Sequence, residues 1–279
     1  MAAADLLVIV TEVILLQINY YYFPVSFLDI TPVCIVVRNL PRVATDCSVW
    51  FTATFTFDRF ITICSQKLKA KYCTGQTAAA VIATTGVFFC LKNIPFYFAY
   101  EPREIIDRVP WFCRWKPSYF TVPAWVRFDW FDTVLTPLLP FSAILLLNAL
   151  TARHVLAAGR VRKRLRGPSP AEKRRDPELE SRRRSVVLLF ALSATFILLW
   201  STSIIFFVYY QINGLEWSDS EFIFLQVGSL LQNVNCCTNT FVYVVTQARF
   251  REQVKIALKY QVTALFQFIL TLGTHLRLS

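Results

Sequence analysis

Long apolar runs alternate with shorter polar connections along most of the chain. Each run approaches or exceeds the roughly 20 residues that a helix needs to cross the hydrocarbon core of a bilayer. The pattern predicts an all-α fold, a polytopic membrane helix bundle. The apolar runs occupy residues 2–23, 32–64, 77–100, 124–156, 185–211 and 222–246.

The composition supports the same class of protein. Hydrophobic residues make up 55% and charged residues only 17% of the 279 residues, and the mean hydropathy is +0.46. A soluble domain usually carries about a quarter charged residues. Aromatic side chains are abundant, which suits membrane interfaces and a pocket between helices. We therefore expect an integral membrane protein.

The charged residues between the runs predict the orientation. Basic residues dominate the connections at 67–71 and 159–184 and the segment 249–259, whereas the alternate connections are acidic or mixed. Because Lys and Arg mark the cytoplasmic side, these basic segments and the amino terminus are expected in the cytosol. They also account for much of the net charge of +11. Nucleic-acid binding is not expected, since the basic residues lie at membrane exits without interleaved aromatics.

Asp58 and Arg59 stand side by side at the cytoplasmic end of the second run. An ionised group in hydrocarbon costs a few kcal/mol or more, so it normally reaches the interface, pairs or has a function. Two interpretations follow from the residues alone: the pair extends to the interface as an ordinary helix end, or it has a specific role.

Arg38 and Arg42 interrupt the outer half of the same run, close to Pro41. Spaced four residues apart, the two arginines share one face of a helix. At this depth they require a partner or a water-filled cavity. The functional hypothesis is an anion-binding pair, and the alternative is sequence divergence without a function.

Several short motifs together resemble the rhodopsin-like (class A) G-protein-coupled receptors. They are Asp-Arg-Phe at 58–60, Trp200 in "LLWSTS", "NTFVY" at 239–243 and the following "FREQVKIALKY". Stretches such as "CLKNIPFYF" and "LLLNALTARHVL" are most similar to the orphan group called probable G-protein coupled receptor 139-like. The resemblance covers residues 1–259 as one receptor bundle with a short amphipathic surface helix, and leaves the tail 260–279 unassigned.

The resemblance implies roles for individual residues. It implies a disulfide between Cys34 and Cys113 on the extracellular side. It also implies a G-protein coupling switch formed by Asp58, Arg59 and Tyr243. Trp200 would be an activation toggle. A sodium site would be formed by Asp5, Ser48, Asn235 and Asn239. The face of the helix that carries Arg38 and Arg42 lines the ligand crevice in this family, and Trp115 is a further candidate for the ligand pocket.

The expected function is that of a receptor which transmits an extracellular signal to a heterotrimeric G protein. The expected partners are a small-molecule or peptide ligand, that G protein and the lipid bilayer, at the plasma membrane. No cofactor is expected apart from a structural sodium ion. An enzyme is not expected, because the sequence shows neither a nucleophile paired with a base nor metal-ligand spacing.

The chain departs from the family in having six apolar runs where the family has seven helices, and the resemblance places the difference at the first helix. Two alternatives therefore stay open beside the signalling receptor. One is a truncated, receptor-derived chain that does not signal and is retained inside the cell. The other is a six-helix channel or transporter, for which a polar stripe or paired broken helices would be needed.

Overall fold

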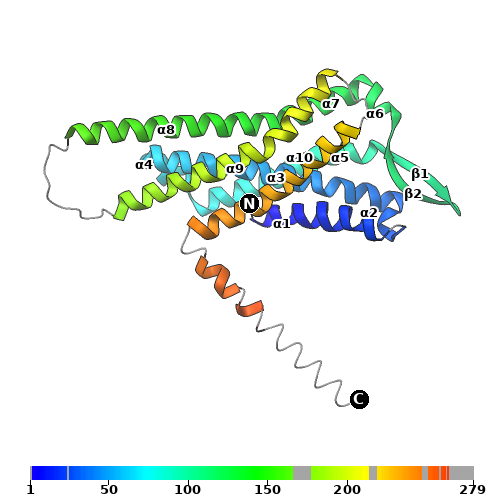
Figure 1. Cartoon of the computed structure of the whole chain (residues 1–279), viewed down its shortest axis with the longest axis horizontal. Helices are drawn as coiled ribbons and strands as arrows, with labels where there is room; N and C mark the ends of the chain where they lie inside the picture. The colour runs from blue at the N-terminus through cyan, green and yellow to red at the C-terminus, as the bar shows by residue number, and fades with distance from the viewer. Residues whose placement is uncertain are drawn as a thin grey trace, which may run out of the picture.

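The computed structural model describes residues 2–23, 25–165, 177–213, 219–246, 251–257, 259–261 and 263. These residues form a bundle of long helices with a two-stranded hairpin at one end and a short helix, α4, at the other (Figure 1). We refer to these as the hairpin end and the α4 end. Residues 251–257 are helical and leave the bundle near the α4 end.

The elements follow the predicted apolar runs closely. Helical geometry passes without a break through α1, η1 and α2, whereas α7, η3 and α8 follow one another across a kink at Thr136; η marks a π- or 3-10 segment. The elements are α1 Ala2–Val8, η1 Ile9–Ile18, α2 Asn19–Tyr22, η2 Phe27–Asp29, α3 Thr31–Cys64, α4 Gln66–Tyr72, α5 Gly75–Phe98, β1 Tyr100–Ile106, β2 Val109–Trp115, α6 Pro117–Thr121, α7 Pro123–Thr133, η3 Val134–Leu138, α8 Leu139–Leu165, α9 Pro177–Asn213 and α10 Asp219–Thr246.

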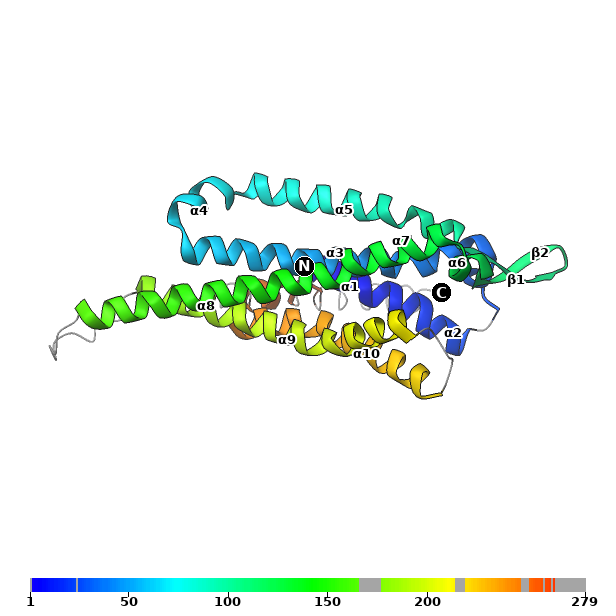
Figure 2. The ribbon, with the colours of Figure 1, turned by 90° about the horizontal axis from the view of Figure 1, so that it is seen from above.

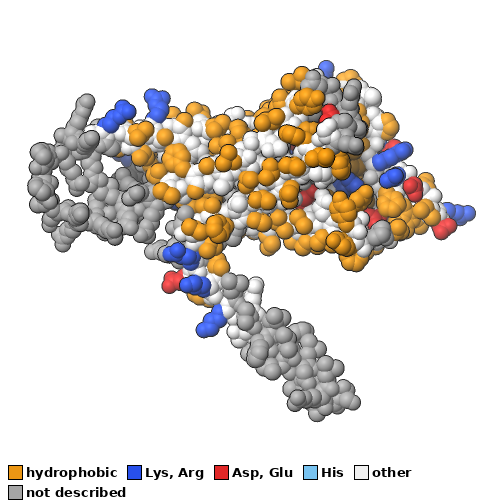
Figure 3. Space-filling model, in the orientation of Figure 1, with side chains coloured by type: hydrophobic (Ala, Val, Ile, Leu, Met, Phe, Trp, Pro, Cys, Tyr) orange, Lys and Arg blue, Asp and Glu red, His pale blue; other side chains and the backbone are white. Residues whose placement is uncertain are grey.

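Within the described residues, four helical stretches are both long and apolar enough to cross a membrane. They are Ala2–Tyr22, Gly75–Phe98, Pro123–Ala158 and Val186–Tyr209. The helices α3 and α10 are also long, at 34 and 28 residues, but they carry more polar side chains. The mostly helical bundle confirms the predicted fold class. Hydrophobic side chains cover much of the middle of the face shown in Figure 3.

Helix α3 is the centre of the bundle. It packs against α1, α5, α8 and α9, and Figure 2 shows it running between α5 and the remaining helices. Pro41 lies inside α3 without ending it. The hydroxyls of Thr52 and Thr56 donate to carbonyls one turn earlier, at 3.0 and 2.8 Å, so these buried groups are satisfied within the helix.

The bend between α7 and α8 is tied to α3. Thr136 has non-helical backbone angles, and Pro137, which has no N–H to donate, follows it inside the π-helical segment. The indole nitrogen of Trp50 on α3 donates to the carbonyl oxygen of Leu135 at 3.2 Å. A carbonyl at the irregular turn is thereby satisfied by a side chain instead of by its own helix.

The connection between α5 and α6 is a β-hairpin, which the apolar pattern of the sequence does not predict. Strands β1 and β2 pair antiparallel, and Asp107 and Arg108 form the turn with φ of 51° and 64°. Positive φ at both central residues is typical of the tight type I′ turn. Because neither residue is glycine, the usual sequence signal of such a turn is missing here.

The predicted disulfide links the hairpin to the first turn of α3. Cys113 on β2 is bonded to Cys34 on α3, and their Cα atoms lie 6.1 Å apart. Beside it, the hydroxyl of Thr31 donates to the carbonyl oxygen of Phe112 at 2.7 Å. These two links hold the hairpin over the hairpin end of the bundle.

We predict that Cys34→Ser lowers the thermal stability of the protein, because the bond closes a long loop between residues 79 apart in sequence. The expected loss is about 2 to 4 kcal/mol, the typical contribution of a disulfide. The measurement is the melting temperature in detergent, with and without reductant. Cys237→Ser, which removes an exposed free thiol, is the control. Equal melting temperatures for the two variants would show that the bond does not stabilise the fold.

Candidate functional site

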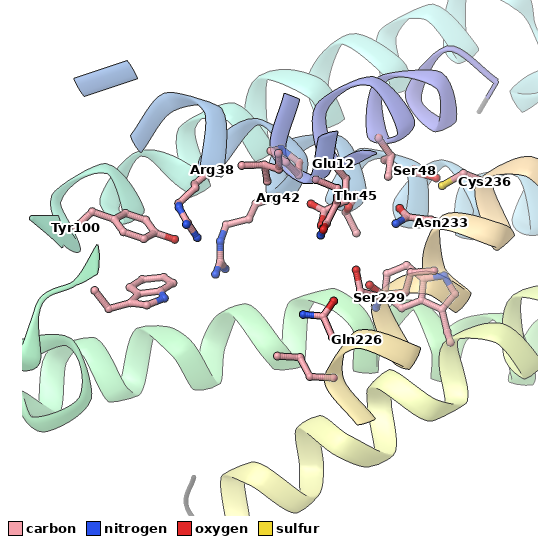
Figure 4. A pocket seen from close by; sticks show the side chains of 18 residues that line it. Glu12, Arg38, Arg42, Thr45, Ser48, Tyr100, Gln226, Ser229, Asn233 and Cys236 are labelled. Atoms are coloured by element: carbon pink, nitrogen blue, oxygen red, sulfur yellow. The ribbon is translucent and has the colours of Figure 1, made fainter. Parts of the chain in front are cut away.

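A cavity of about 450 Å³ opens among η1, α3, the base of the hairpin, α9 and α10. Figure 4 shows Arg38 and Arg42 pointing into it beside Tyr100, with Glu12 bordering the same space. Polar groups on α10 complete its lining, namely Gln226, Ser229, Gln232 and Asn233. The cavity thus combines two cations and one acid with uncharged hydrogen-bonding groups.

The predicted pair of arginines does share one helix face, and both side chains line this cavity. The guanidinium carbon of Arg42 lies 4.3 Å from the ring centre of Phe96 and 5.3 Å from that of Trp115. Contact with the faces of aromatic rings stabilises a partly desolvated cation without neutralising it. Arg42 therefore keeps its positive charge at the cavity, where Glu12 is the acidic group of the lining.

Aromatic rings form the wall next to Arg42. Trp115 stacks on Tyr100 at 4.2 Å and lies 4.3 Å from Tyr119, between ring centres. The hydroxyl of Tyr119 donates to Asp129 at 2.7 Å. Burial, together with the charge of Asp129, raises the pKa of Tyr119, so this hydroxyl stays protonated and remains a donor. Trp115, a candidate for the ligand pocket, thus lies in the wall of this cavity.

A second cavity of about 250 Å³ adjoins the first and is lined by a charge network that was not predicted from the sequence. Lys92 on α5 forms ion pairs with Asp46 on α3, at 2.7 Å, and with Asp132 on α7. Its side chain is only 4% exposed. Asn93 donates to the same oxygen of Asp46 at 2.7 Å. Isolated charges in three separate apolar runs were the available signal, since such groups usually pair inside a membrane.

Trp200 borders both cavities from α9. Its ring stacks on Phe196 with 5.4 Å between centres, and the residue is 5% exposed. In the part of the chain that the structure describes, the indole nitrogen has no hydrogen-bond partner. The residue assigned as a toggle thus sits between the cavities and the core.

Asp5, Ser48 and Asn239 of the predicted sodium site come together next to the cavity, which Ser48 also lines, and Asn235 lies one helical turn from Asn239 on α10. Ser48 donates to one oxygen of Asp5, and the amide nitrogen of Asn239 donates to the other at 3.3 Å. Asp5 is 3% exposed. The side-chain oxygens of Asn235 and Asn239 are buried and lack hydrogen-bond partners among the described residues. A carboxylate, a hydroxyl and two unpartnered amide oxygens match the oxygen ligands that hard cations prefer.

Asp58 and Arg59 form an ion pair with each other toward the α4 end of α3. Their side chains are 32% and 29% exposed, so the pair lies at the rim and not in the core. The guanidinium carbon of Arg59 also lies 5.1 Å from the ring centre of Phe55. The side chain of Tyr243, the third predicted member of this switch, lies outside the described residues.

A comparison with protein families gives one match. The model of the family described as 7 transmembrane receptor (rhodopsin family) matches residues 1–243. The match spans the central helix with its charged groups, both cavities and most of α10. Among the described residues, three or more His, Cys, Asp or Glu side chains do not come together as a ligand set.

We predict that Lys92→Met destabilises the protein strongly, because it leaves the buried carboxylate of Asp46 and the half-buried one of Asp132 without their cation. Removing one partner of a buried ion pair costs about 3 to 5 kcal/mol. The melting temperature in detergent should fall clearly below that of Lys67→Met, which changes an exposed lysine.

Stability should return when the acids are neutralised as well, in the combined variant Asp46→Asn, Lys92→Met, Asp132→Asn. If the combined variant melted as low as Lys92→Met alone, the effect would come from packing of the lysine stem and not from the charges.

Proposed function

The chain belongs to the rhodopsin family of seven-transmembrane receptors, and on that premise we propose that it transmits the binding of an extracellular ligand to a heterotrimeric G protein. The family is one of receptors, so the chain is a multi-pass membrane receptor and not an enzyme. The observation that carries the proposal is the Asp58–Arg59 ion pair at one rim of the bundle, opposite a polar cavity near the hairpin.

In the proposed mechanism, Asp58 holds Arg59 in the resting state. Ligand binding favours a state in which this restraint is broken and Arg59 contacts the G protein. A ligand shifts such an equilibrium only by its difference in affinity for the two states. Trp200 could link ligand binding to this change, because it borders the cavities and stacks on the core residue Phe196.

The ligand pocket of this proposal is the larger cavity. Arg38 and Arg42 would bind an anionic group of a small molecule or peptide, and Trp115 would contact its apolar part. Support comes from the two arginines on the cavity wall and from the aromatic rings that contact Arg42. The fitting ligand therefore carries at least one negative charge next to an aromatic or aliphatic group.

The proposal extends to orientation and subfamily. The helices that coincide with the six predicted apolar runs would correspond to the second through seventh helices of the family. The α4 end and the amino terminus would then lie in the cytosol. The basic connection 67–71 at the α4 end supports this orientation. The stretches "CLKNIPFYF" and "LLLNALTARHVL" support assignment to the group called probable G-protein coupled receptor 139-like.

A sodium ion at Asp5 would stabilise the resting state. Its ligands would be Asp5, Ser48, Asn235 and Asn239, and when bound it would supply the positive charge that the buried carboxylate lacks. The two unpartnered amide oxygens are the support for this site. An ion held by these groups would link α1, α3 and α10, which carry its ligands.

We predict that sodium chloride raises the melting temperature of the purified protein by a few degrees relative to choline chloride, because an ion that binds only the folded state stabilises it. Asp5→Asn should remove this difference. Asp107→Asn, which neutralises a carboxylate in the hairpin turn, should retain it. A sodium effect of the same size in Asp5→Asn would exclude this site.

The coupling proposal is tested by nucleotide exchange on purified G-protein heterotrimers, with the chain in lipid nanodiscs. We expect Asp58→Asn to raise basal exchange severalfold above wild type, because it frees the arginine. Arg59→Ala should reduce exchange to the receptor-free rate while melting like wild type, since the residue lies at the rim. The double variant should behave like Arg59→Ala.

Two other outcomes would change the conclusion. Stimulated exchange that is equal in wild type and Arg59→Ala would show that Asp58 and Arg59 form an ordinary ion pair at the membrane interface. Exchange at the receptor-free rate for both wild type and Asp58→Asn, with every heterotrimer class, would favour the receptor-derived chain that does not signal.

A further inference from the structure

The smaller cavity is lined by buried hydrogen-bonding groups that the described residues leave without a partner. Trp200 on α9, Thr136 in η3 and Asn93 on α5 all line it, and they are only 5%, 9% and 3% exposed. The groups concerned are the indole nitrogen of Trp200, the hydroxyl of Thr136 and the side-chain oxygen of Asn93. An unsatisfied buried polar group is costly, so three of them around one cavity point to an occupant that pairs with them.

The three groups differ in what they require. The indole N–H of Trp200 only donates, so it needs an acceptor. The Asn93 oxygen only accepts, and its position is determined by the amide nitrogen, which donates to the carboxylate of Asp46 at 2.7 Å and to the carbonyl oxygen of Phe89 at 2.9 Å. The hydroxyl of Thr136 can donate or accept. An occupant that satisfies all three must therefore offer both donors and an acceptor.

The charges around the smaller cavity favour a neutral occupant. Three acidic and two basic side chains line it, so an anion would add to an excess of negative charge. A cation would meet Lys92, whose ammonium group already lies between Asp46, at 2.7 Å, and Asp132. An ammonium group also has no acceptor for the indole N–H of Trp200.

The two cavities share part of their walls, so one ligand with two polar groups can reach both. Arg42 and Trp200 line each of them, whereas Arg38 lines only the larger of the two. Figure 4 shows Arg42 pointing into the larger cavity. A ligand whose anionic group is bound by Arg42 therefore has the smaller cavity within reach.

We propose that the ligand carries, besides its anionic group, a primary carboxamide that binds in the smaller cavity. The carbonyl oxygen of this group accepts from the indole nitrogen of Trp200, and its two N–H groups donate to the side-chain oxygen of Asn93 and the hydroxyl of Thr136. A carboxamide combines two donors with an acceptor and has no charge. This inference rests on the proposed function, because it describes a second part of the ligand that the arginines would bind.

The test measures the affinities of three compounds for the full chain in lipid nanodiscs by ligand-observed NMR titration. The first, 3-phenylglutaramate, carries one carboxylate and one carboxamide. In 5-oxo-3-phenylhexanoate a methyl group replaces the amide nitrogen and removes both donors. In 3-phenylglutarate a second carboxylate replaces the amide. The amide should bind about fivefold more tightly than the ketone, the effect of one hydrogen bond, and about tenfold more tightly than the dianion, because of like-charge repulsion.

Two variants locate the carboxamide. Asn93→Leu removes the acceptor, so the amide should bind no more tightly than the ketone. Trp200→Phe removes the indole donor and should weaken the amide and the ketone about fivefold each, because both compounds carry the carbonyl group. Trp130→Phe is the matched control, since Trp130 is 43% exposed and lines neither cavity, and all three affinities should be unchanged.

The comparison of the amide with the ketone on the wild-type chain decides the matter even if Asn93→Leu fails to fold. Equal or tighter binding of the ketone or the dianion would overturn the carboxamide assignment and identify water as the occupant of the smaller cavity. Weaker binding of all three compounds to Arg42→Met would then still support the ligand pocket of the proposed function. If none of the compounds bound to the wild-type chain, the pocket and the carboxamide assignment would both be overturned. Because the assay contains no G protein, its result does not depend on whether the receptor signals.

Discussion

The ion pairs of Lys92 hold the middle of the bundle together. One ammonium group on α5 reaches a carboxylate on α3 and another on α7, and it is almost fully buried. Inside a membrane neither acid can be left alone, so the three helices must keep their relative rotation and depth. The same rotation directs Arg42, one turn from Asp46, toward the larger cavity.

Helix α3 connects the parts of the molecule that a receptor must couple. Its hairpin end carries the disulfide through Cys34, its middle carries Arg42 and Ser48 at the cavity and the Asp5 cluster, and its α4 end carries Arg59. The outer helices can be apolar because they meet lipid. The central helix can be polar because its neighbours supply partners for its charges. A signal passing between the two ends has a continuous structural element to follow.

Periodicity alone could predict the shared face of Arg38 and Arg42, because a spacing of four is local to one helix. The family resemblance supplied the pairing of Cys34 with Cys113. The partners of Lys92 could not be assigned, since they lie on runs 40 or more residues away and nothing local specifies which helices meet. The hairpin was not predictable for a different reason. Its turn uses Asp107 and Arg108 at positive φ, without the glycine that is the usual sequence signal of such a turn.

The polarity of α3 has a consequence for how the protein is made. On an insertion scale, each charged residue at the centre of a lone helix costs about 2.5 to 3.5 kcal/mol, and this helix carries Arg42 and Asp46 in its outer half, close to its centre. Such a segment partitions poorly into lipid by itself at the translocon. Its carboxylate becomes compatible with the bilayer only once Lys92 arrives, and that residue is synthesised 46 positions later. Integration of this helix is therefore a cooperative, delayed event, in which the nascent chain must be sheltered until its later helices emerge.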